Sequence, residues 1–353
     1  MKTETSVLQT DAIQSEWLTT RAAFESLEPE WLELWENSAN ATPFQSPIWL
    51  VPWWRHFGNN HLWCCAMRCD GALVGFAPLL IDHLDSPGPR GVFFLGTGVS
   101  DYLDILARRG FEKIVANEFF RQLAERRGEW DVCDFQELRR DSILLSADFQ
   151  KDFSLEKTVQ ENCLVLELPN KNAELSNAIP KGALEKLLYY RRRAERAGTV
   201  QIEAAAENNF EKLFDEFVRL HFARWNERGG DGVLVGNAIQ NFHREAARGF
   251  LKLNLLRLYA LCLDGRIIAT LYGFEFRGRF FYYLGGFDPQ FSKLNPGTLI
   301  IGHAIEQALR VGASEFDFLR GREKYKYAWG AKERKNFRVI ATNRAAESNR
   351  ANY

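Results

Sequence analysis

The sequence lacks a strong charge of either sign. Its 45 Lys and Arg residues nearly balance its 46 Asp and Glu residues, which leaves a net charge of −1. Proteins that bind nucleic acid or anionic lipid over a wide surface usually carry a marked positive charge. The balance therefore disfavours a general nucleic-acid binder and leaves room only for a local basic patch.

The sequence also lacks a long apolar run. The longest, Leu73 to Ile81, contains Gly75 and Pro78, whereas a membrane-spanning helix needs about 20 apolar residues. The first residues, MKTETSVLQTDAIQSEW, are polar and have no apolar segment of the kind that a secretory signal needs. We therefore expect no membrane span and a cytoplasmic location.

Several chemical signatures are missing as well. The six cysteines form no C-x-x-C pair and have no metal-type spacing, which predicts reduced core thiols and no bound metal. There is no G-x-S-x-G, H-E-x-x-H or P-loop sequence, and no tandem G-x-G-x-x-G. Hydrolase, zinc protease and nucleotide-kinase functions therefore have little support.

Three landmarks occur twice, in the same order. Asp70-Gly71 and Asp264-Gly265 each lie between apolar runs, which is a hairpin pattern. The other two landmarks are a strand that ends in Leu-Gly, at residues 95–96 and 284–285, and a strand that contains Asp-Phe, at residues 134–135 and 317–318. Three matched landmarks indicate two copies of one fold.

Each copy reads as helices, a hairpin, a strand, a helix and a strand. This order is typical of a mixed α/β sheet flanked by helices. A helix is predicted to begin at Pro47 after Ser46, and apolar spacing predicts another over 208–226. We expect two domain-sized units in 353 residues, with boundaries at 1–20 (tail), 21–165 (unit 1), 166–335 (unit 2) and 336–353 (tail).

The order of elements resembles the GNAT acyl-CoA N-acyltransferase fold, in the tandem arrangement of the Fem-type aminoacyltransferases. The chain looks most like the CelD-like branch, whose members are described as cellulose- or polysaccharide-biosynthesis acetyltransferases. The stretches that carry this resemblance are FQSPIWLVPWW (44–54), DGALVGFAPLL (70–80), LGTGVSDYLDIL (95–106), LHFARW (220–225), LDGRIIATLYGF (263–274), YYLGGFDPQFSKLNPGTLI (282–300) and EFDFLRGREKYKYAWGA (315–331).

The resemblance implies two tandem GNAT-like units and an acyltransferase activity. Acetyl-CoA or another acyl-CoA would be the donor. The acceptor would be an amine or hydroxyl of a small molecule or carbohydrate, such as a sugar or a cell-envelope or polysaccharide precursor. Unit 2 is the catalytic candidate, because only it has both a Pro-Gly helix start and a polar segment after its last strand.

The donor would bind after the strand at 279–284. We expect a turn at Gly285-Gly286 and a helix that starts at Pro296-Gly297. Unpaired N–H groups at a helix N-terminus and its positive dipole end favour a pyrophosphate. In GNAT proteins the equivalent loop holds coenzyme A. The usual Gln/Arg-x-x-Gly-x-Gly/Ala pattern is absent here. The residues expected to bind the cofactor are Gly285, Gly286, Lys293, Pro296, Gly297 and Thr298.

The polar run after the next strand would carry the chemistry. Amide formation needs a base for the acceptor's proton and an acid for the departing thiolate. Asp317 or Glu323 is the candidate base and Tyr325 the candidate acid. Arg320 or Lys326 would hold an anionic acceptor or a phosphate. The alternative is a salt-bridged structural loop.

Three further groups of residues are candidates. Asp101, Tyr102 and Asp104 follow a Gly-rich turn in unit 1 and would bind acceptor hydroxyls or amines, or would only cap the turn and pack. His221 continues an apolar helix stripe, which fits a buried histidine or a general base. Arg224 lies one turn further along that helix and is a candidate for acceptor binding.

Two other functions stay open. A basic helix at 181–198, with Lys186, Arg191, Arg192, Arg193 and Arg196, would bind tRNA in a Fem-type aminoacyl transfer, or would simply be a solvated face. A degenerate GNAT pair would act as a non-catalytic scaffold in polysaccharide assembly. The sequence indicates neither the oligomeric state nor the acceptor.

Overall fold

A computed structural model describes residues 13–58, 61–84, 88–146, 153–169, 173–227 and 229–343. The chain divides into two compact units: unit 1 contains residues 1–54, 58–160 and 337–353, and unit 2 contains residues 55–57 and 161–336. Strands β8 (Phe153–Glu167) and β14 (Lys332–Asn343) contribute residues to both units. Along the sequence, most of unit 2 therefore lies between two segments of unit 1.

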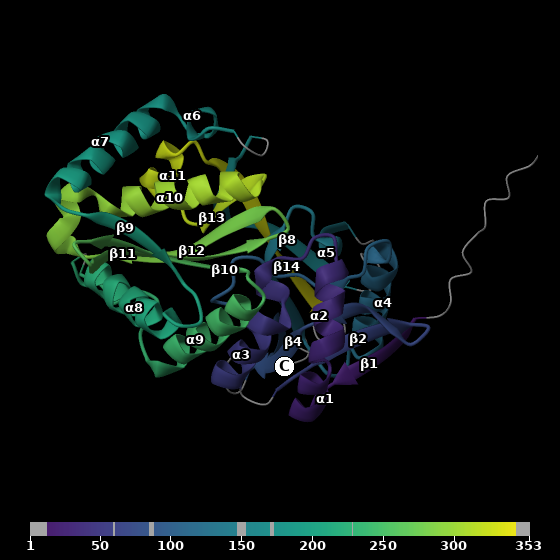
Figure 1. The fold of residues 1–353 in the computed structure, drawn as a ribbon. Helices are drawn as coiled ribbons and strands as arrows, with labels where there is room; N and C mark the ends of the chain where they lie inside the picture. Colours follow the sequence, from purple (N-terminus) through teal and green to yellow (C-terminus); the bar gives the residue numbers. More distant parts are fainter. Residues whose placement is uncertain are drawn as a thin grey trace, which may run out of the picture. The chain divides into compact units, whose positions relative to one another are not determined.

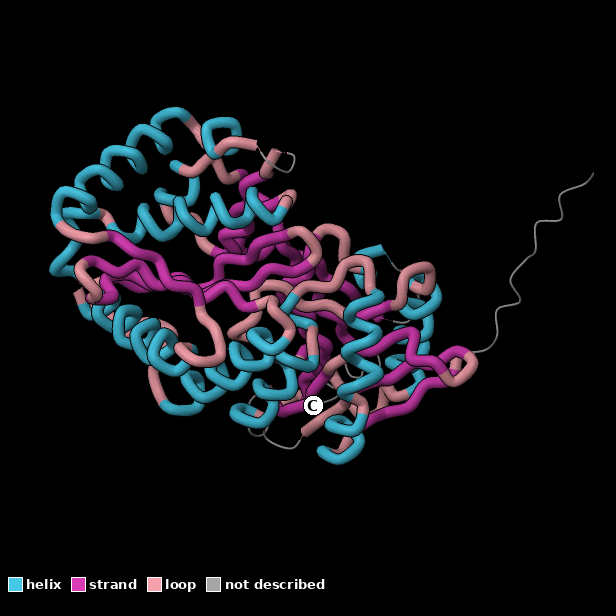
Figure 2. Tube along the Cα trace, viewed as in Figure 1, coloured by secondary structure: helices cyan, strands magenta, loops and turns pink. Residues whose placement is uncertain are grey.

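Unit 2 is a sheet between two helical layers, with α8 and α9 on one side and α7 and α10 on the other (Figures 1 and 2). The sheet order is β8, β13, β12, β11, β10, β9. The bounds are α6 (Leu175–Ala178), α7 (Lys181–Ala197), β9 (Val200–Ala204), α8 (Phe210–Asn226), α9 (Asn237–Lys252), β10 (Leu256–Leu263), β11 (Arg266–Phe276), β12 (Arg279–Phe287), η2 (Pro289–Leu294), α10 (Pro296–Val311), β13 (Glu315–Arg320) and α11 (Lys324–Ala328).

The helices of unit 2 follow from their apolar spacing. Helix α8 buries Phe210, Leu213, Phe214, Phe217 and Leu220, the five positions of the predicted stripe, so the helix predicted over 208–226 is confirmed. Helix α10 begins at Pro296 and ends where Gly312 takes the left-handed conformation, with φ of 81°. Both ends match the usual preference for proline at a helix start and glycine after its end.

Unit 1 repeats this plan. Its bounds are β1 (Gln14–Leu18), α1 (Arg21–Ser26), α2 (Glu28–Asn37), η1 (Pro43–Gln45), α3 (Pro47–Phe57), β2 (Cys64–Cys69), β3 (Ala72–Ala77), β4 (Leu79–His83), β5 (Arg90–Phe94), β6 (Leu106–Ala107), α4 (Glu112–Glu125), β7 (Val132–Arg139) and α5 (Ile143–Ser146). Strands β1, β2, β3 and β6 form one sheet. Strands β4, β5 and β7 continue into the unit 1 parts of β14 and β8.

Side chains that alternate along β3 show how unit 1 packs. Phe76 lies against Trp31 of α2, with ring centroids 4.7 Å apart. The neighbouring Gly75 faces the other way, and a side chain there would meet Val115 of α4 at 2.6 Å. Helices α2 and α4 therefore cover opposite faces of β3. The predicted start of α3 is also confirmed, because the Ser46 hydroxyl accepts a hydrogen bond from the Trp49 amide at 3.2 Å.

The duplicated landmarks occupy equivalent places. Asp70 and Asp264 both have positive φ, 50° and 48°, as the first residues of tight hairpin turns. In each unit a short parallel pair of strands ends with a Phe opposite an Asp: Phe93 with Asp134 in unit 1, and Phe281 with Asp317 in unit 2. The predicted mixed α/β fold with two similar units is confirmed.

Some expectations differ from the structure. Gly285 and Gly286 do not form a turn, because they lie inside β12 and pair with β11. Residues 336–343 were expected in a tail but belong to β14, where Arg338 forms a two-pronged ion pair with Asp134 at 2.6 and 2.7 Å. Strand β1 lies in the expected N-terminal tail, whose residues 1–12 are outside the described part of the chain.

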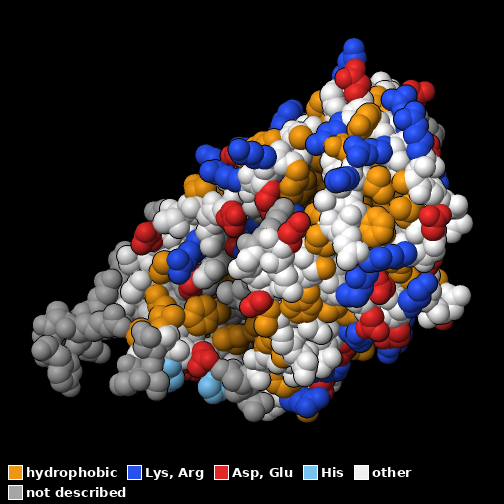
Figure 3. Space-filling view, turned by 90° about the vertical axis from the view of Figure 1, so that its left-hand side faces the viewer, with side chains coloured by type: hydrophobic (Ala, Val, Ile, Leu, Met, Phe, Trp, Pro, Cys, Tyr) orange, Lys and Arg blue, Asp and Glu red, His pale blue; other side chains and the backbone are white. Residues whose placement is uncertain are grey.

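Two features are absent from the described residues. No helix there is both long and apolar enough to span a membrane. No group of three or more His, Cys, Asp or Glu side chains in those ranges is arranged to hold a metal ion. On the face drawn in Figure 3, Lys and Arg side chains lie among acidic and hydrophobic ones.

Candidate active site

The candidate site lies where β12 and β13 separate. The two strands pair in parallel over three positions, ending at Phe281 and Asp317, although β12 continues to Phe287. Strand β13 turns away because Leu319 has a left-handed φ of 58°. The Asp317 carboxylate, 1% exposed, accepts a hydrogen bond from the Leu319 amide at 2.8 Å. Asp317 therefore holds the turn that opens the sheet.

A hydrogen-bonded group of side chains lies at this opening. Tyr282 of β12 belongs to the hydrophobic cluster on the α10 side of the sheet. Its hydroxyl is hydrogen-bonded by Tyr325 of α11 and by Arg224 of α8. A guanidinium of Arg224 also donates to the Gly285 carbonyl at 3.3 Å. Helix α8 lies on the opposite side of the sheet from α10. Arg224 therefore links the two sides of the sheet at this point.

Burial sets the protonation state of the two phenols. It raises the pKa of Tyr282, and Arg224 opposes part of that rise. Burial also raises the pKa of Tyr325, and the neighbouring Tyr282 and Glu323 add to the effect. Both hydroxyls therefore keep their protons across the physiological pH range and are available as hydrogen-bond donors.

The N-terminus of α10 follows β12 by way of η2. Asn295 is left-handed, with φ of 51°, and Pro296 is the first helical residue. The Thr298 hydroxyl donates to the Asn295 side chain at 3.0 Å. At Gly297 an added side chain would meet only the Phe287 ring, at 3.8 Å. Lys293 is exposed on η2. An anionic group can therefore approach the helix N-terminus closely.

The other predicted residues of this segment have structural contacts. The Lys326 ammonium, 3% exposed, donates to the backbone carbonyls of Arg320 and Gly321 and forms an ion pair with Glu323 at 2.9 Å. The Glu323 side chain is half exposed. The side chain of Lys326 thus stabilises the loop after β13. Glu323 is exposed at the surface of this loop, and Arg320 is partly buried.

His221 lies on the α8 side of β12. It is 1% exposed, and among the described residues its ring has only a marginal hydrogen bond, to the Gly285 backbone. Burial lowers the pKa of His221 to about 4, a shift that the nearby Gly285 backbone partly offsets and the positive charge of Arg224 reinforces. The imidazole is therefore neutral near pH 7, and a neutral imidazole can accept a proton.

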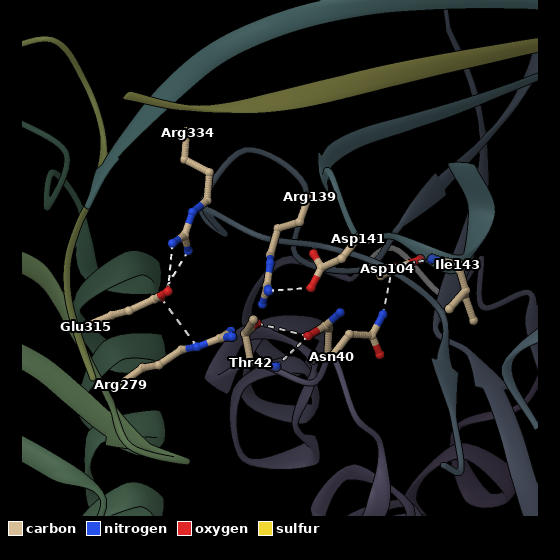
Figure 4. A network of polar contacts seen from close by, with 10 residues as sticks. Asn40, Thr42, Asp104, Arg139, Asp141, Ile143, Arg279, Glu315 and Arg334 are labelled. Atoms are coloured by element: carbon tan, nitrogen blue, oxygen red, sulfur yellow. Dashed lines mark hydrogen bonds and ion pairs between the residues drawn. The ribbon is translucent and has the colours of Figure 1, made fainter. Parts of the chain in front are cut away.

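The predicted acceptor residues of unit 1 are all buried. Asp104 is buried and accepts hydrogen bonds from Asn40 at 3.2 Å and from the Ile143 amide at 3.3 Å (Figure 4). Burial raises the pKa of its carboxyl to about 7. The ring of Tyr102 is buried beneath the Arg139 guanidinium, 5.5 Å away. Asp101, also buried, lies in the same segment.

Three residues near the opening were missed in the sequence. Tyr282, Thr270 and Tyr272 read as ordinary strand residues, because hydrophobic periodicity does not tell which side of a fully buried sheet bears a function. The one available signal was the pair of polar positions two apart, Thr270 and Tyr272, within the apolar stretch IIATLYGF.

Comparisons with known proteins bear on this geometry. Residues 182–327 match the acetyltransferase (GNAT) domain family. This range contains the opening between β12 and β13, the start of α10 and every residue described here for unit 2. A search of curated proteins gives no match.

Among solved structures, FemX has 13% identity and a TM-score of 0.64, covering 92% of this chain and 96% of its own. The C-terminal domain of a putative lysylphosphatidylglycerol synthetase from Agrobacterium fabrum has 12% identity and a TM-score of 0.59, covering 92% and 94%. L-PGS from Bacillus licheniformis has 12% identity and a TM-score of 0.53, covering 84% and 91%.

At these sequence identities the solved structures establish the fold of the chain alone. Its activity has to be argued from the geometry of the site. The expected CelD-like branch is not distinguished by any of these comparisons. GNAT domains typically use acyl-CoA donors, and the domain match covers the segment that the geometry singles out. The match of residues 182–327 to the acetyltransferase (GNAT) domain family thus supports an N-acyltransferase activity for unit 2.

Proposed function

We propose that unit 2 transfers an acetyl group from acetyl-CoA to an amino group. The separation of β12 from β13 beside the N-terminus of α10 is the observation that carries this proposal. The thioester would enter the opening, and the pyrophosphate would lie at Gly297 and Thr298, with Lys293 near it. The N–H groups and the dipole of α10 favour an anion at that place.

The side chains at the opening suit the steps of the transfer. The lone pair of the amine attacks the thioester carbonyl carbon, a C–N bond forms, the C–S bond breaks, and the nitrogen loses a proton to a base. The departing thiolate needs a proton, and Tyr325 is the partly buried donor at the opening. Tyr282, which Tyr325 and Arg224 both contact, fixes the orientation of that hydroxyl. On the basis of the CelD-like sequence motifs, we assign the acceptor to sugars or cell-envelope precursors.

A charge placed at Gly297 tests the donor site. An Asp at the second position of a helix stabilises the helix but repels a pyrophosphate. Gly297→Asp should therefore abolish acetyl-CoA binding, measured by calorimetry, without lowering the thermal stability. The matched control is Gly182→Asp, which makes the same change at the second position of α7, where a side chain meets nothing within 4 Å. Equal acetyl-CoA affinity in both variants would reject the donor site.

Transfer itself is measured as thiol release with a panel of amines. Release that requires an amine supports the proposal. Tight acetyl-CoA binding with no release, for any amine or amino sugar tried, would favour the non-catalytic scaffold instead. Absence of both binding and release would remove the acetyl-CoA function.

Aminoacyl transfer from aminoacyl-tRNA is the second candidate. It is favoured by the fold shared with FemX over nearly the whole chain and by the basic outer face of α7. On that helix Lys186, Arg192 and Arg196 are exposed, whereas Arg191 pairs with Glu306 at 2.6 Å. Changing the three exposed residues to Ala should weaken tRNA association in filter binding. Unchanged association would reject this candidate.

A further inference from the structure

The segment that joins β12 to α10 has a buried carboxylate that takes no part in the transfer described above. Asp288 directly follows β12 and is 5% exposed. One of its carboxylate oxygens accepts a hydrogen bond from the Gln290 amide at 3.0 Å, and the other forms an ion pair with Arg266 at 2.6 Å. Arg266 is the first residue of β11. The pair therefore connects the start of η2 to a second strand of the sheet.

Arg266 makes two further contacts with η2. Its guanidinium donates to the Gln290 side-chain oxygen at 3.3 Å and lies over the Phe291 ring, 5.0 Å from the centroid. Phe291 in turn packs against the hydrophobic cluster on the α10 side of the sheet. A guanidinium that binds a carboxylate and lies on an aromatic ring is fixed in both position and orientation. We call Arg266, Asp288, Gln290 and Phe291 the Arg266 clamp.

The Arg266 clamp fixes one end of η2, and Asn295 fixes the other. The Asn295 amide donates to the Ser292 carbonyl at 2.9 Å, and the Asn295 side chain accepts a hydrogen bond from the Thr298 hydroxyl at 3.0 Å. Lys293 lies between these two ends. Hydrogen bonds in a 3-10 helix have poor geometry, so a helix this short depends on contacts at its ends. The clamp therefore determines where Lys293 lies relative to the first turn of α10.

The composition of this segment explains why side chains have this role. Glycine-rich loops surround a phosphate with backbone N–H groups. Residues 287–295 contain no glycine. A pyrophosphate at this place depends instead on the first turn of α10 and on the ammonium of Lys293. Both must be in position when the donor arrives.

The charge of Asp288 allows a positioning role to be separated from a direct electrostatic effect. Asp288 is the only acidic residue in the segment 287–299. A negative charge close to the site of a polyanion opposes its binding. If Asp288 acted only through its charge, its removal would tighten acetyl-CoA binding. If it positions η2, its removal weakens binding, so the two roles predict changes of opposite sign.

We propose that Asp288 and Arg266 are positioning residues for the donor, which hold η2 so that Lys293 and the first turn of α10 contact the pyrophosphate of acetyl-CoA together. This inference rests on the proposed acetyl transfer. Neither residue takes part in making or breaking a bond, and both act through η2. Because the clamp exists before the donor binds, it lowers the cost of ordering the loop. Its loss therefore weakens donor binding and leaves the chemical step unchanged.

The test uses the full chain, with acetyl-CoA affinity measured by calorimetry and transfer measured as thiol release. Asp288→Ala should raise Kd and KM for acetyl-CoA about tenfold and leave kcat at saturating acetyl-CoA within about twofold. Asp288→Asn keeps an oxygen for the Gln290 amide and loses the charge, so it should raise both constants only about threefold. The matched control is Glu275→Ala, which breaks an ion pair of the same 2.6 Å length, with Arg257, and should change neither constant.

A second variant tests whether the pair acts as a unit. Arg266→Ala should raise the Kd of acetyl-CoA about tenfold, and the double variant Asp288→Ala with Arg266→Ala should raise it no further, because either change alone already releases η2. Thermal scans measure whether each variant is folded. Asp288→Asn keeps the helix cap and gives the answer if Asp288→Ala does not fold.

Three results would overturn this inference and leave the proposed function standing. They are acetyl-CoA affinity that is unchanged or tighter in the Asp288 variants, a loss confined to kcat, and losses that add in the double variant. Absence of acetyl-CoA binding by the unaltered chain would overturn the proposed function, and this inference with it.

Discussion

Tyr325 stays protonated because it is largely removed from solvent beside a second phenol and a carboxylate. We therefore expect Tyr325→Phe to lower kcat for acetyl transfer by about 100-fold, because the departing thiolate then lacks the proton that Tyr325 supplies. Calorimetry should show unchanged acetyl-CoA affinity. Tyr327→Phe is the control: it lies on the same helix, and its exposed hydroxyl donates to Glu333 at 2.6 Å. Equal loss in both variants would point to damage to α11.

The Tyr272 hydroxyl has no hydrogen-bond partner among the described residues, which has a consequence for stability that is separate from activity. Tyr272→Phe removes a buried polar atom and keeps the ring contacts with Phe217 and Tyr283. We expect the free energy of unfolding to rise by about 1 kcal/mol, which corresponds to about 2–4 °C in a unit of this size. Calorimetric scans measure the shift. A fall of similar size would show that the hydroxyl is bonded in the free protein.

Protonation of His221 and His243 predicts how unit 2 responds to acid. Burial lowers the pKa of both imidazoles, to about 4 and about 3, whereas an unfolded histidine titrates near 6.5. The unfolded state therefore binds more protons below pH 6.5, and the stability of unit 2 should fall as pH drops from 6.5 towards 4. Each histidine contributes a slope of up to about 1.4 kcal/mol per pH unit.

Urea titrations between pH 7.5 and 4.5 measure that slope. In His243→Phe, the slope of the unfolding free energy against pH should correspond to the uptake of about one proton fewer on unfolding. His61→Phe, which removes a half-exposed histidine beside Asp82, is the matched control for the loss of a histidine side chain. A stability that stays constant down to pH 5 would contradict buried neutral imidazoles.

Helix α8 and strand β12 meet at a glycine. The positions of the side chains on both faces of β12 depend on this contact. A methyl group at Gly286 would lie 2.3 Å from the backbone of Leu220 and His221, which cannot move without moving α8. Gly286→Ala should therefore lower the free energy of unfolding by about 1–3 kcal/mol and displace Arg224 from Gly285. Denaturant unfolding and thiol release measure the two effects.

Gly182→Ala is the matched control for that change. Gly182 lies in the first turn of α7, where a side chain meets nothing within 4 Å. Alanine is the better helix residue, so this variant should be as stable as the original or more so by up to about 1 kcal/mol. A loss at Gly286 no larger than at Gly182 would show that β12 tolerates a side chain there.

Individual elements were predictable where one residue decides a local conformation. Ser46-Pro47 and Pro296 fixed helix starts, and Asp-Gly fixed two hairpins, because cap and turn conformations depend on neighbours in sequence. The left-handed Leu319 and the separation of β13 from β12 were not predictable. Leucine has no preference for that conformation, and the buried Asp317 contact that supports it is tertiary.

The same limit applied to the site. Tyr325 and His221 were named as candidates because their residue types suit proton transfer. Which groups they face depends on distant partners: Tyr282 and Arg224 for Tyr325, and Gly232 and Gly286 for His221. From the sequence, Lys326 was a candidate for binding an anion. Only the folded structure shows that its ammonium donates to backbone carbonyls.

At the scale of the whole molecule, the C-terminal segment is part of unit 1. Residues 337–343 of β14 bury Val339 and Ala341 in its core, and the Asn343 side chain donates to the Arg127 carbonyl at 2.6 Å. We expect a chain truncated after residue 336 to show two unfolding transitions, with unit 1 lost first. A chain truncated after residue 343 is the control and should unfold like the full chain. Identical transitions in both would contradict this assignment.

The strand order of unit 1, in which β14 lies between β7 and β8, has a consequence for biosynthesis. While the ribosome is still adding residues 161–336, unit 1 lacks an internal strand, and the edge of β7 stays open. Unit 2 by contrast is complete once residue 336 has left the exit tunnel. The later-made unit should thus fold before the earlier-made one, and nascent unit 1 is the form that needs chaperone protection against edge-to-edge aggregation.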